Sequence, residues 1–386
     1  MTDPMRRRRL LALCAVLGGV LILLAGLVVA GYRMDRDQET KALTDGCKGV
    51  LARPQARAIL GDGPYKDDPD ESRDEGRPGD TKHTLKVRCT VFGGEVALTT
   101  HIDAVPSHGH QGSSDGLYPR TRTQLPPQPL GSGWQGIFAV NDTLSYKSPQ
   151  PLIAILLECR RLREDLLVTV AADLDDADMP LDDPRIRARF ARFATATAER
   201  ANARWKCGAA VGDLPKDVAL PPGRDDYVPL QAARGTCAHL PGQGPNASLA
   251  WEGHTDSEGA TAPLEQCVLG RTAPLATPAY ELRAHYGPYA EEVRAQSRAD
   301  SIHSDEKNPA NADAGRRHWV SGFWASASCP ETSERALYTI QRSGPSGNDP
   351  PRGKEQRKAE TYEKSALKAF AERSAKRHGC TPPVLP

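Results

Sequence analysis

The sequence predicts an α+β protein: an N-terminal transmembrane helix, then two related domains, each an antiparallel sheet packed by a C-terminal helix and cross-linked by disulfides. Three observations predict this class. A block of four arginines precedes a long apolar run near the start of the chain. Eight cysteines beyond that run form two sets of four, placed in the same order relative to apolar strands and a final helix. Such self-similarity indicates a tandem repeat.

Residues 10–31 are expected to form a membrane anchor. They contain no charged side chain, and about 20 apolar residues are enough to cross a bilayer core. Arg6–Arg9 should stay in the cytoplasm, so residues 1–9 form a cytoplasmic tail and the rest of the chain is extracellular. The partner of the anchor is membrane lipid. One alternative stays open, because Val28-Val29-Ala30 is a permissible signal-peptide cleavage site. Cys14 lies inside the run and is interpreted as a membrane-buried cysteine.

Composition excludes a nucleic-acid partner and bounds the number of domains. The 386 residues suggest two or three domains, and an aromatic content of only 5% predicts modest cores with long loops. Without Arg6–Arg9 and Asp3, 46 basic and 48 acidic residues remain, which gives a net charge of −2 rather than a basic surface. We expect a first α+β domain, a linker and a second α+β domain at residues 42–210, 211–234 and 235–386.

The first domain opens with a helical region and a charged loop. Residues 35–60 are predicted to be helical, with Asp45 as a cap, Pro54 starting a further turn and Gly61 ending it. Residues 62–80 are acidic and rich in proline and glycine, which is typical of a solvated loop.

Strands follow, and a long helix closes the domain. Two alternating runs on either side of Gly93-Gly94 predict a hairpin. The predicted strands are residues 84–92, 95–103, 134–140, 152–159 and 166–172, with a long loop at 104–133. Asp183 should cap a helix that begins at Pro184. Its apolar stripe has helical spacing: Ile186, Phe190, Phe193, Thr197, Ala201 and Trp205. Four arginines near this stripe are interpreted as a solvated face: Arg185, Arg187, Arg189 and Arg192.

The second domain repeats this pattern after a proline- and charge-rich linker. Its predicted strands are residues 264–269, 279–286, 319–329 and 336–340, and its predicted helices are residues 289–298 and 358–378. Residues 301–316 are expected to be a polar loop.

Cysteines outside the cell favour disulfides. The chain has no CxxC pair and no Cys/His spacing typical of zinc, so we expect no structural metal. In each half the third cysteine ends an apolar strand. The chain then turns, forms a second strand and returns as a helix, which brings the fourth cysteine to the same end of the sheet as the third. The two remaining cysteines would then tie the opening segment to the first sheet. The predicted disulfides are Cys159–Cys207, Cys329–Cys380, Cys47–Cys89 and Cys237–Cys267.

Three patterns resemble catalytic or metal-binding sequences. Residues 112–116 fit G-x-S-x-G, but neither the preceding strand nor the following helix of that motif is predicted. Residues 365–368 fit S-x-x-K without its companion motifs. Imidazole and carboxylate groups that suit zinc or copper gather within ten residues: His101, Asp103, His108 and His110. Most of them lie in a predicted loop, so the sequence favours a solvated loop, no cofactor and no catalytic residue.

The start of the first domain carries a further pattern. It consists of Asp45-Gly46-Cys47-Lys48-Gly49-Val50-Leu51, then Ala56, Ile59, Leu60 and Gly61, then a strand with Cys89. This pattern resembles the opening of actinobacterial envelope proteins of unknown function. Those proteins are often lipoproteins, whereas this chain has no lipobox. The resemblance implies an extracytoplasmic α+β domain and no activity.

The sequence favours a non-catalytic protein that binds or scaffolds at the cell envelope, with another envelope protein as a candidate partner. Two alternatives remain. One is an anchored metal-dependent hydrolase that uses His101, His108 and His110. The other is an extracellular sensor that partners a membrane signalling complex. Because the cytoplasmic tail spans only residues 1–9, such a sensor needs a partner with a cytosolic domain.

Overall fold

The structure is a computed structural model of the chain. It describes residues 43–68, 73–80, 84–106, 125–141, 150–174, 179–242, 247–254, 262–271, 277–300, 312–317, 322–330, 335–342 and 353–386. The predicted anchor, residues 10–31, lies outside these ranges. Within them, no helix combines the length and the apolar character that a membrane crossing requires.

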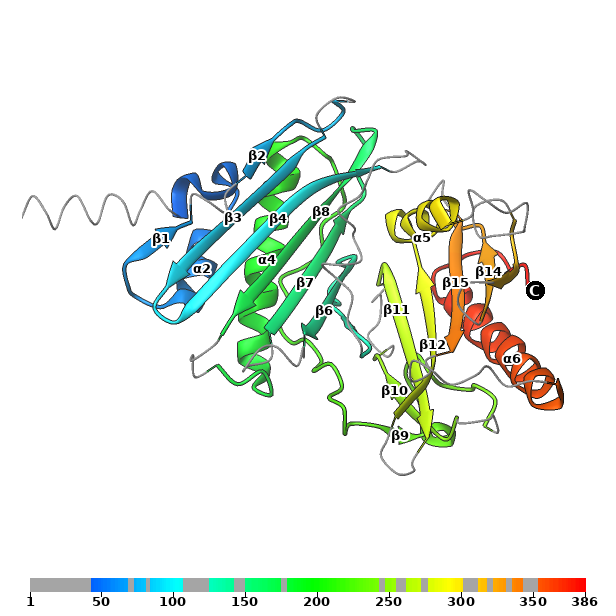
Figure 1. Cartoon of the computed structure of the whole chain (residues 1–386). Coiled ribbons are helices and arrows are strands. Elements are labelled where there is room, and N and C mark those ends of the chain that lie inside the picture. Colours follow the sequence, from blue (N-terminus) through cyan, green and yellow to red (C-terminus); the bar gives the residue numbers. More distant parts are fainter. Residues whose placement is uncertain are drawn as a thin grey trace, which may run out of the picture.

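The first half is an eight-stranded antiparallel sheet covered by helices. Its strand order is β1-β3-β4-β8-β7-β6-β5, and β2 also pairs with β3. The strands are β1 (Tyr65–Asp67), β2 (Arg73–Glu75), β3 (Lys86–Gly93), β4 (Val96–Pro106), β5 (Gln128–Pro129), β6 (Gly136–Asn141), β7 (Gln150–Leu157) and β8 (Glu164–Asp173). Helix α4 (Pro184–Arg204) packs on β7 and β8, and α2 (Arg53–Leu60) packs on α4. Figure 1 shows α4 behind this sheet.

The second half is a seven-stranded antiparallel sheet with the order β13-β14-β15-β12-β11-β10-β9. Its strands are β9 (Val228–Pro229), β10 (Leu249–Glu252), β11 (Leu264–Arg271), β12 (Thr277–His285), β13 (Gly315–Arg317), β14 (Gly322–Ala327) and β15 (Ala336–Arg342). Helix α6 (Gly353–Arg377) packs on β12, β14 and β15. Helix α5 (Pro288–Asp300) follows β12.

The two halves share one strand order. In the first half, β3-β4-β8-β7-β6 are consecutive neighbours, and in the second half β11-β12-β15-β14-β13 are neighbours in the same sequence. Cys89 and Cys267 lie on the first strand of each series. Cys159 and Cys329 follow the equivalent strands β7 and β14, and a long helix ends each half (Figure 1). The two halves therefore agree in strand order and in the placement of their cysteines.

Four pairs of cysteines lie at disulfide distance, and they are the pairs that the sequence predicts. The Cα–Cα distances are 5.4 Å for Cys47–Cys89, 4.6 Å for Cys159–Cys207, 5.2 Å for Cys237–Cys267 and 4.0 Å for Cys329–Cys380. Each half is therefore closed by two cross-links of its own.

The long helix of the first half begins as predicted. The Asp183 carboxylate accepts a hydrogen bond from the backbone N–H of Arg185 at 2.8 Å, and Pro184 is the first helical residue. The apolar stripe faces the sheet, with Phe190 and Phe193 almost fully buried. The prediction that the arginines of this helix form a solvated face is wrong for Arg187. Arg187 is buried, and its guanidinium donates to backbone carbonyls, including that of Val218 at 2.6 Å.

Three local predictions for the first half are corrected. Asp45 lies inside a helical turn of residues 43–49, so it does not cap that turn. The hairpin turn is Gly94-Glu95, because Gly93 pairs with Val96 in the sheet. Gly93 is a strand residue for a packing reason, since a Cβ there would lie 2.7 Å from the Leu60 Cβ. The predicted acidic loop contains β1 and β2, which pair with opposite ends of β3 and so cover an edge strand.

The second half also contains elements that the sequence did not predict. Strands β9 and β10 precede β11, and β13 begins inside the predicted polar loop. The predicted linker is packed on both halves rather than free. Its Val218 belongs to the core of the first half, and its Leu230 belongs to the core of the second.

The two sheets contact each other through the faces that turn away from α4 and α6. In β7, Ile155 and Leu157 face the core of the first half, whereas Leu156 faces the second half. One buried apolar cluster joins the halves. It contains Val105, Ile137, Ala154, Leu156 and Leu167 of the first half and Ala262, Leu264, Tyr289, Ala290, Val293, Trp324 and Leu337 of the second. Because α5 supplies Tyr289, Ala290 and Val293, this helix lies at the contact between the halves.

Candidate functional site

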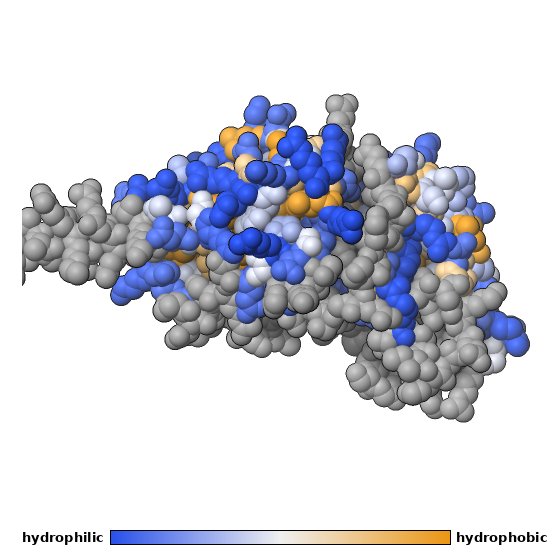
Figure 2. Space-filling view, turned by 90° about the horizontal axis from the view of Figure 1, so that it is seen from above, coloured by the Kyte–Doolittle hydropathy of each residue, from blue (hydrophilic) through white to orange (hydrophobic). Residues whose placement is uncertain are grey.

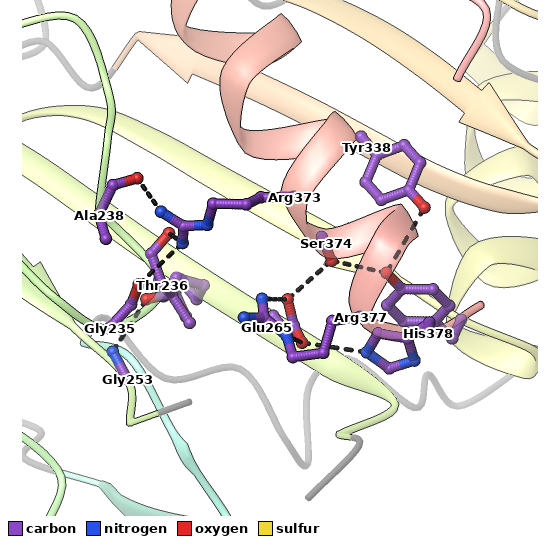
Figure 3. Close-up of polar contacts among 12 residues, drawn as sticks. Gly235, Thr236, Ala238, Gly253, Glu265, Tyr338, Arg373, Ser374, Arg377 and His378 are labelled. Carbon is purple, nitrogen blue, oxygen red and sulfur yellow. Dashed lines mark hydrogen bonds and ion pairs between the residues drawn. The ribbon is translucent and has the colours of Figure 1, made fainter. Parts of the chain in front are cut away.

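A group of ionisable side chains surrounds Glu265 in the second half (Figure 3). Glu265 is the second residue of β11, and it alternates with Cys267 and Leu269, which belong to the core of the second half. A strand directs every second side chain to the same face, so the carboxylate points into the core beneath α6. Only 6% of Glu265 is exposed.

Three side chains near the C-terminal end of α6 donate to this carboxylate. The Ser374 hydroxyl is 2.7 Å from one carboxylate oxygen. The Arg377 guanidinium spans both oxygens, at 3.0 and 2.8 Å. His378 Nε2 lies 3.0 Å from the oxygen that also accepts from Arg377 Nε. Charged donors in a buried setting make strong hydrogen bonds, so these contacts fix the end of α6 on the sheet.

The surroundings keep the Glu265 carboxylate ionised. Burial alone would raise the pKa of this carboxyl, because it removes water from the charged form. The hydrogen bond from His378 and the positive charge of Arg377 outweigh burial and lower the pKa to about 2. The network therefore contains a carboxylate anion at any pH that the folded chain is expected to meet.

Two tyrosines extend the network toward α5. The Tyr286 hydroxyl lies 2.6 Å from the Ser374 hydroxyl and 3.5 Å from the Tyr338 hydroxyl. The Tyr286 ring stacks on the His378 ring with a centroid distance of 3.7 Å. Burial raises the pKa of Tyr286 well above its usual value and raises the pKa of Tyr338 to about 12. Both phenols are thus neutral, and Tyr286 connects α6 to the chain that enters α5.

The geometry of this network matches a structural clamp better than a catalytic site. A nucleophilic serine needs a general base within hydrogen-bond reach and access for a substrate. Here the Ser374 hydroxyl contacts the Glu265 carboxylate and the Tyr286 hydroxyl, and Ser374 has no exposed surface. The Glu265 carboxylate itself lies between the serine and His378. The arrangement holds the C-terminal helix against β11 and β12.

A second clamp lies one turn earlier on α6. The Arg373 guanidinium donates to the carbonyls of Gly235 at 2.8 Å and Thr236 at 3.1 Å, and also to the carbonyl of Ala238 (Figure 3). These residues surround Cys237, which is bonded to Cys267 on β11. Helix α6 is thereby tied to the opening segment of the second half as well as to its sheet.

The sequence did not identify this network, although it contained a signal. Glu265 lies in an apolar run, in register with Cys267 and Leu269, so strand alternation places a carboxylate at a core position. A buried carboxylate requires cationic or hydrogen-bonding partners. Which residues supply them depends on the packing of α6, more than 100 residues later in the chain.

The predicted metal ligands are only partly described. His101 and Asp103 lie on β4, two residues apart and therefore on the same face, opposite Arg88 and Lys86 of β3. His108 and His110 lie outside the described residues. Within the described ranges, no group of three or more His, Cys, Asp or Glu side chains is arranged to hold a metal ion. The hydrolase that uses all three histidines stays an untested prediction.

The two serine motifs give no assembled site in the part of the chain that the structure describes. Residues 112–116 lie outside it. Ser365 is on α6 and donates to the carbonyl of Tyr362 at 2.8 Å, as a helix-surface serine does. Lys368 of the same motif is largely exposed and lies 4.0 Å from Glu372. The S-x-x-K pattern is thus part of the outer surface of a helix.

The coloured surface in Figure 2 is mainly hydrophilic, with small apolar areas. No protein-family model, no curated protein and no solved structure matches this chain.

Proposed function

We propose that the chain is a single-pass membrane protein whose two halves lie outside the cytoplasm, where they act as a non-catalytic binding or scaffolding module of the cell envelope. The observation that carries this proposal is the set of four cysteine pairs at disulfide distance, two in each half. Disulfides persist in oxidising compartments and are rare in the cytosol. All eight cysteines that follow the apolar run are used in these pairs.

The N-terminal sequence supports attachment to the membrane. Residues 10–31 are uncharged and long enough for one crossing, and Arg6–Arg9 favour a cytoplasmic N-terminus. Such an orientation places both cross-linked halves on the oxidising side. The anchor and the disulfides are independent features, and both favour the same compartment.

The internal arrangement of the halves favours binding over catalysis. The ionisable network around Glu265 has a buried carboxylate at its centre, and its members are bonded to one another. An apolar cluster and the hydrogen bond between His254 and Gln128 join the two halves. A pair of cross-linked sheets held together in this way presents a stiff outer surface, which suits a scaffold because little ordering entropy is lost on binding.

Protease treatment of protoplasts tests the proposal. The full chain carries an epitope tag after Pro386, and a matched version carries it before Met1. We expect protease to remove the C-terminal tag from intact protoplasts and to leave the N-terminal tag, with both forms in the membrane fraction. Protection of the C-terminal tag would contradict the orientation. Release of both halves into the medium would show that residues 10–31 are a cleaved signal peptide rather than an anchor.

A further inference from the structure

The chain after α4 returns along that helix. We call residues 209–222 the return segment. Near its start, the Asn202 side chain exchanges two hydrogen bonds with the backbone of Ala209, at 3.0 and 3.1 Å. Arg192 then donates to the carbonyl of Pro215 at 2.8 Å, and Arg187 donates to the carbonyl of Val218 at 2.6 Å. In these successive contacts the residue numbers of α4 decrease while those of the return segment increase. The return segment therefore runs antiparallel to α4.

The other side of the return segment is attached to the loop before β6. The Trp134 indole N–H donates to the carbonyl of Asp213 at 2.8 Å, and the Asp213 N–H donates to the carbonyl of Ser132 at 2.7 Å. Gly212 approaches this loop so closely that a Cβ would lie 2.3 Å from the Ser132 carbonyl oxygen. The backbone of the segment is therefore held from two directions.

Burial along the return segment repeats every three residues. Pro215, Val218 and Pro221 are buried against the first half, and Gly212 occupies the preceding position of the same series. A period of three is that of a polyproline II helix, which the two leucine–proline steps at 214–215 and 220–221 also favour. The residues one position before each member of this series therefore lie together on a face that points outward. They are Val211, Leu214, Asp217 and Leu220, and all four are exposed.

Three of these four outward residues are apolar. Val211, Leu214 and Leu220 are 44%, 56% and 38% exposed, and they make up half of the six exposed large hydrophobic residues among those described. The other three are scattered over β3, the segment before β9 and the C-terminus: Phe92, Tyr227 and Val384. Scattered apolar residues are normal on a surface, whereas an aligned set on a fixed backbone is the pattern of a recognition segment.

We propose that the outward face of the return segment, formed by Val211, Leu214, Asp217 and Leu220, docks into an aromatic-lined groove of another envelope protein that also presents a basic residue to Asp217. Aromatic grooves are the usual receptors of polyproline II segments. The charged residues of the return segment favour a protein rather than a lipid surface as its binding partner. Asp213 and Asp217 flank Leu214, and carboxylates beside the apolar residues oppose insertion into a membrane. Among the described residues, the only exposed large aromatic side chains are Phe92 and Tyr227, which do not favour a second copy as the receptor.

This inference rests on the proposed binding function and names its surface. It can fail alone: if the protoplast experiment confirms the orientation while the experiment below fails, only the docking surface is rejected. The backbone of the segment is already fixed by Arg187, Arg192 and Trp134, so docking would cost little further ordering.

Site-specific photo-crosslinking in the full-length chain tests the docking surface. A photoreactive amino acid replaces Leu214 in cells that produce the protein at its native level. The matched control places it at Phe92, which is apolar and 40% exposed but lies on β3. We expect position 214 to form a discrete adduct with a second protein and position 92 to form none. The probe for competition is a synthetic peptide of residues 209–224, added to isolated membranes, which should reduce the adduct.

Charge reversal separates docking from fold. Asp217→Lys should lower the yield of the adduct about tenfold, since it places like charges together in the complex. Lys216→Asp, one position away on a different side of the segment, is the matched control and should leave the yield unchanged. Both variants should retain four disulfides and the unfolding midpoint of the parent. An adduct with lipid only, an adduct with another copy only, an equal adduct from position 92, or no adduct would each overturn the proposal.

Discussion

The backbone N–H of His254 donates a hydrogen bond to Oε1 of Gln128 at 2.7 Å, and these two residues belong to different halves of the chain. The neighbouring Gly253 also approaches the first half, since a Cβ there would lie 2.9 Å from the carbonyl oxygen of Pro127. Nearby, Leu125 packs against the cluster that contains Trp251. With the apolar cluster around α5, these contacts join the two halves at two places, so we expect the halves to unfold as one unit.

Replacing Leu156 tests this coupling. Leu156 is 4% exposed and belongs to the cluster between the halves, where Gly287 lies next to its Cδ2. Leu156→Ala should lower the free energy of unfolding by about 2–5 kcal/mol, because it leaves a cavity in a buried apolar contact. Denaturant unfolding, followed by fluorescence, measures the change.

Leu214→Ala is the control for this substitution, because Leu214 is 56% exposed. It should change the free energy of unfolding by no more than about 0.5 kcal/mol. Equal, small effects of both substitutions would show that the contact between the halves contributes little to stability.

Glu265→Gln tests the clamp through its pH dependence. The pKa of Glu265 is lowered to about 2 from the usual value of 4.5, because its hydrogen bonds and the charge of Arg377 outweigh burial. A depressed carboxyl pKa stabilises the fold above pH 4.5, and this stabilisation is lost as pH falls from about 4.5 to about 2. The shift corresponds to about 3 kcal/mol, so Glu265→Gln should lower the free energy of unfolding by about that amount at pH 7. Its stability should also fall less steeply below pH 4.5 than that of the parent.

Glu363→Gln is a control with the opposite sign. Burial raises the pKa of Glu363, against the effect of its hydrogen bond from Arg342. A raised carboxyl pKa disfavours the fold as pH rises, so removing this carboxyl should not flatten the acid limb of the stability profile. If Glu265→Gln and Glu363→Gln gave the same profile between pH 2 and 5, the ionised state assigned to Glu265 would be wrong.

The equivalent disulfides of the two halves should contribute equally. Cys159–Cys207 closes a separation of 48 residues and Cys329–Cys380 closes one of 51. Chain entropy then predicts a loss of about 4 kcal/mol for replacing either pair with alanine. Unfolding of the two double variants by guanidinium measures this. A difference of several kcal/mol between them would mean that native packing, rather than loop closure, sets the contribution of each pair.

Strands and helices with a single dominant pattern were predictable from the sequence. Helix α4 has a capping aspartate, a proline at its first position and an apolar stripe, so local and long-range preferences agree. The apolar runs at residues 152–159 and 166–172 correctly indicated the strands β7 and β8. The sequence did not show that the second face of each is covered by the other half, because Leu156 and Leu167 are equally compatible with a covering helix or sheet.

The short strands and the clamp depend on tertiary contacts. Strands β1, β2 and β9 have only two or three residues each, and they exist because longer neighbours offer them unpaired edges. Arg187 was assigned to a solvated face from helix periodicity. It is buried because the return segment, for which the sequence predicts neither a helix nor a strand, lies across that side of α4. The disulfides could be predicted because the order of strands and helices limits which cysteines can lie at the same end of a sheet.

Disulfide mapping of the protein taken from the membrane fraction of intact cells is the most direct test of the extracytoplasmic location and of the four disulfides. Free thiols are blocked before lysis, and the full chain is digested without reduction and analysed by mass spectrometry. We expect four linked peptide pairs, Cys47–Cys89, Cys159–Cys207, Cys237–Cys267 and Cys329–Cys380, with Cys14 alone alkylated. Alkylation of the eight later cysteines would contradict an extracytoplasmic location. A link between cysteines of different halves would contradict two halves that are each closed by their own disulfides.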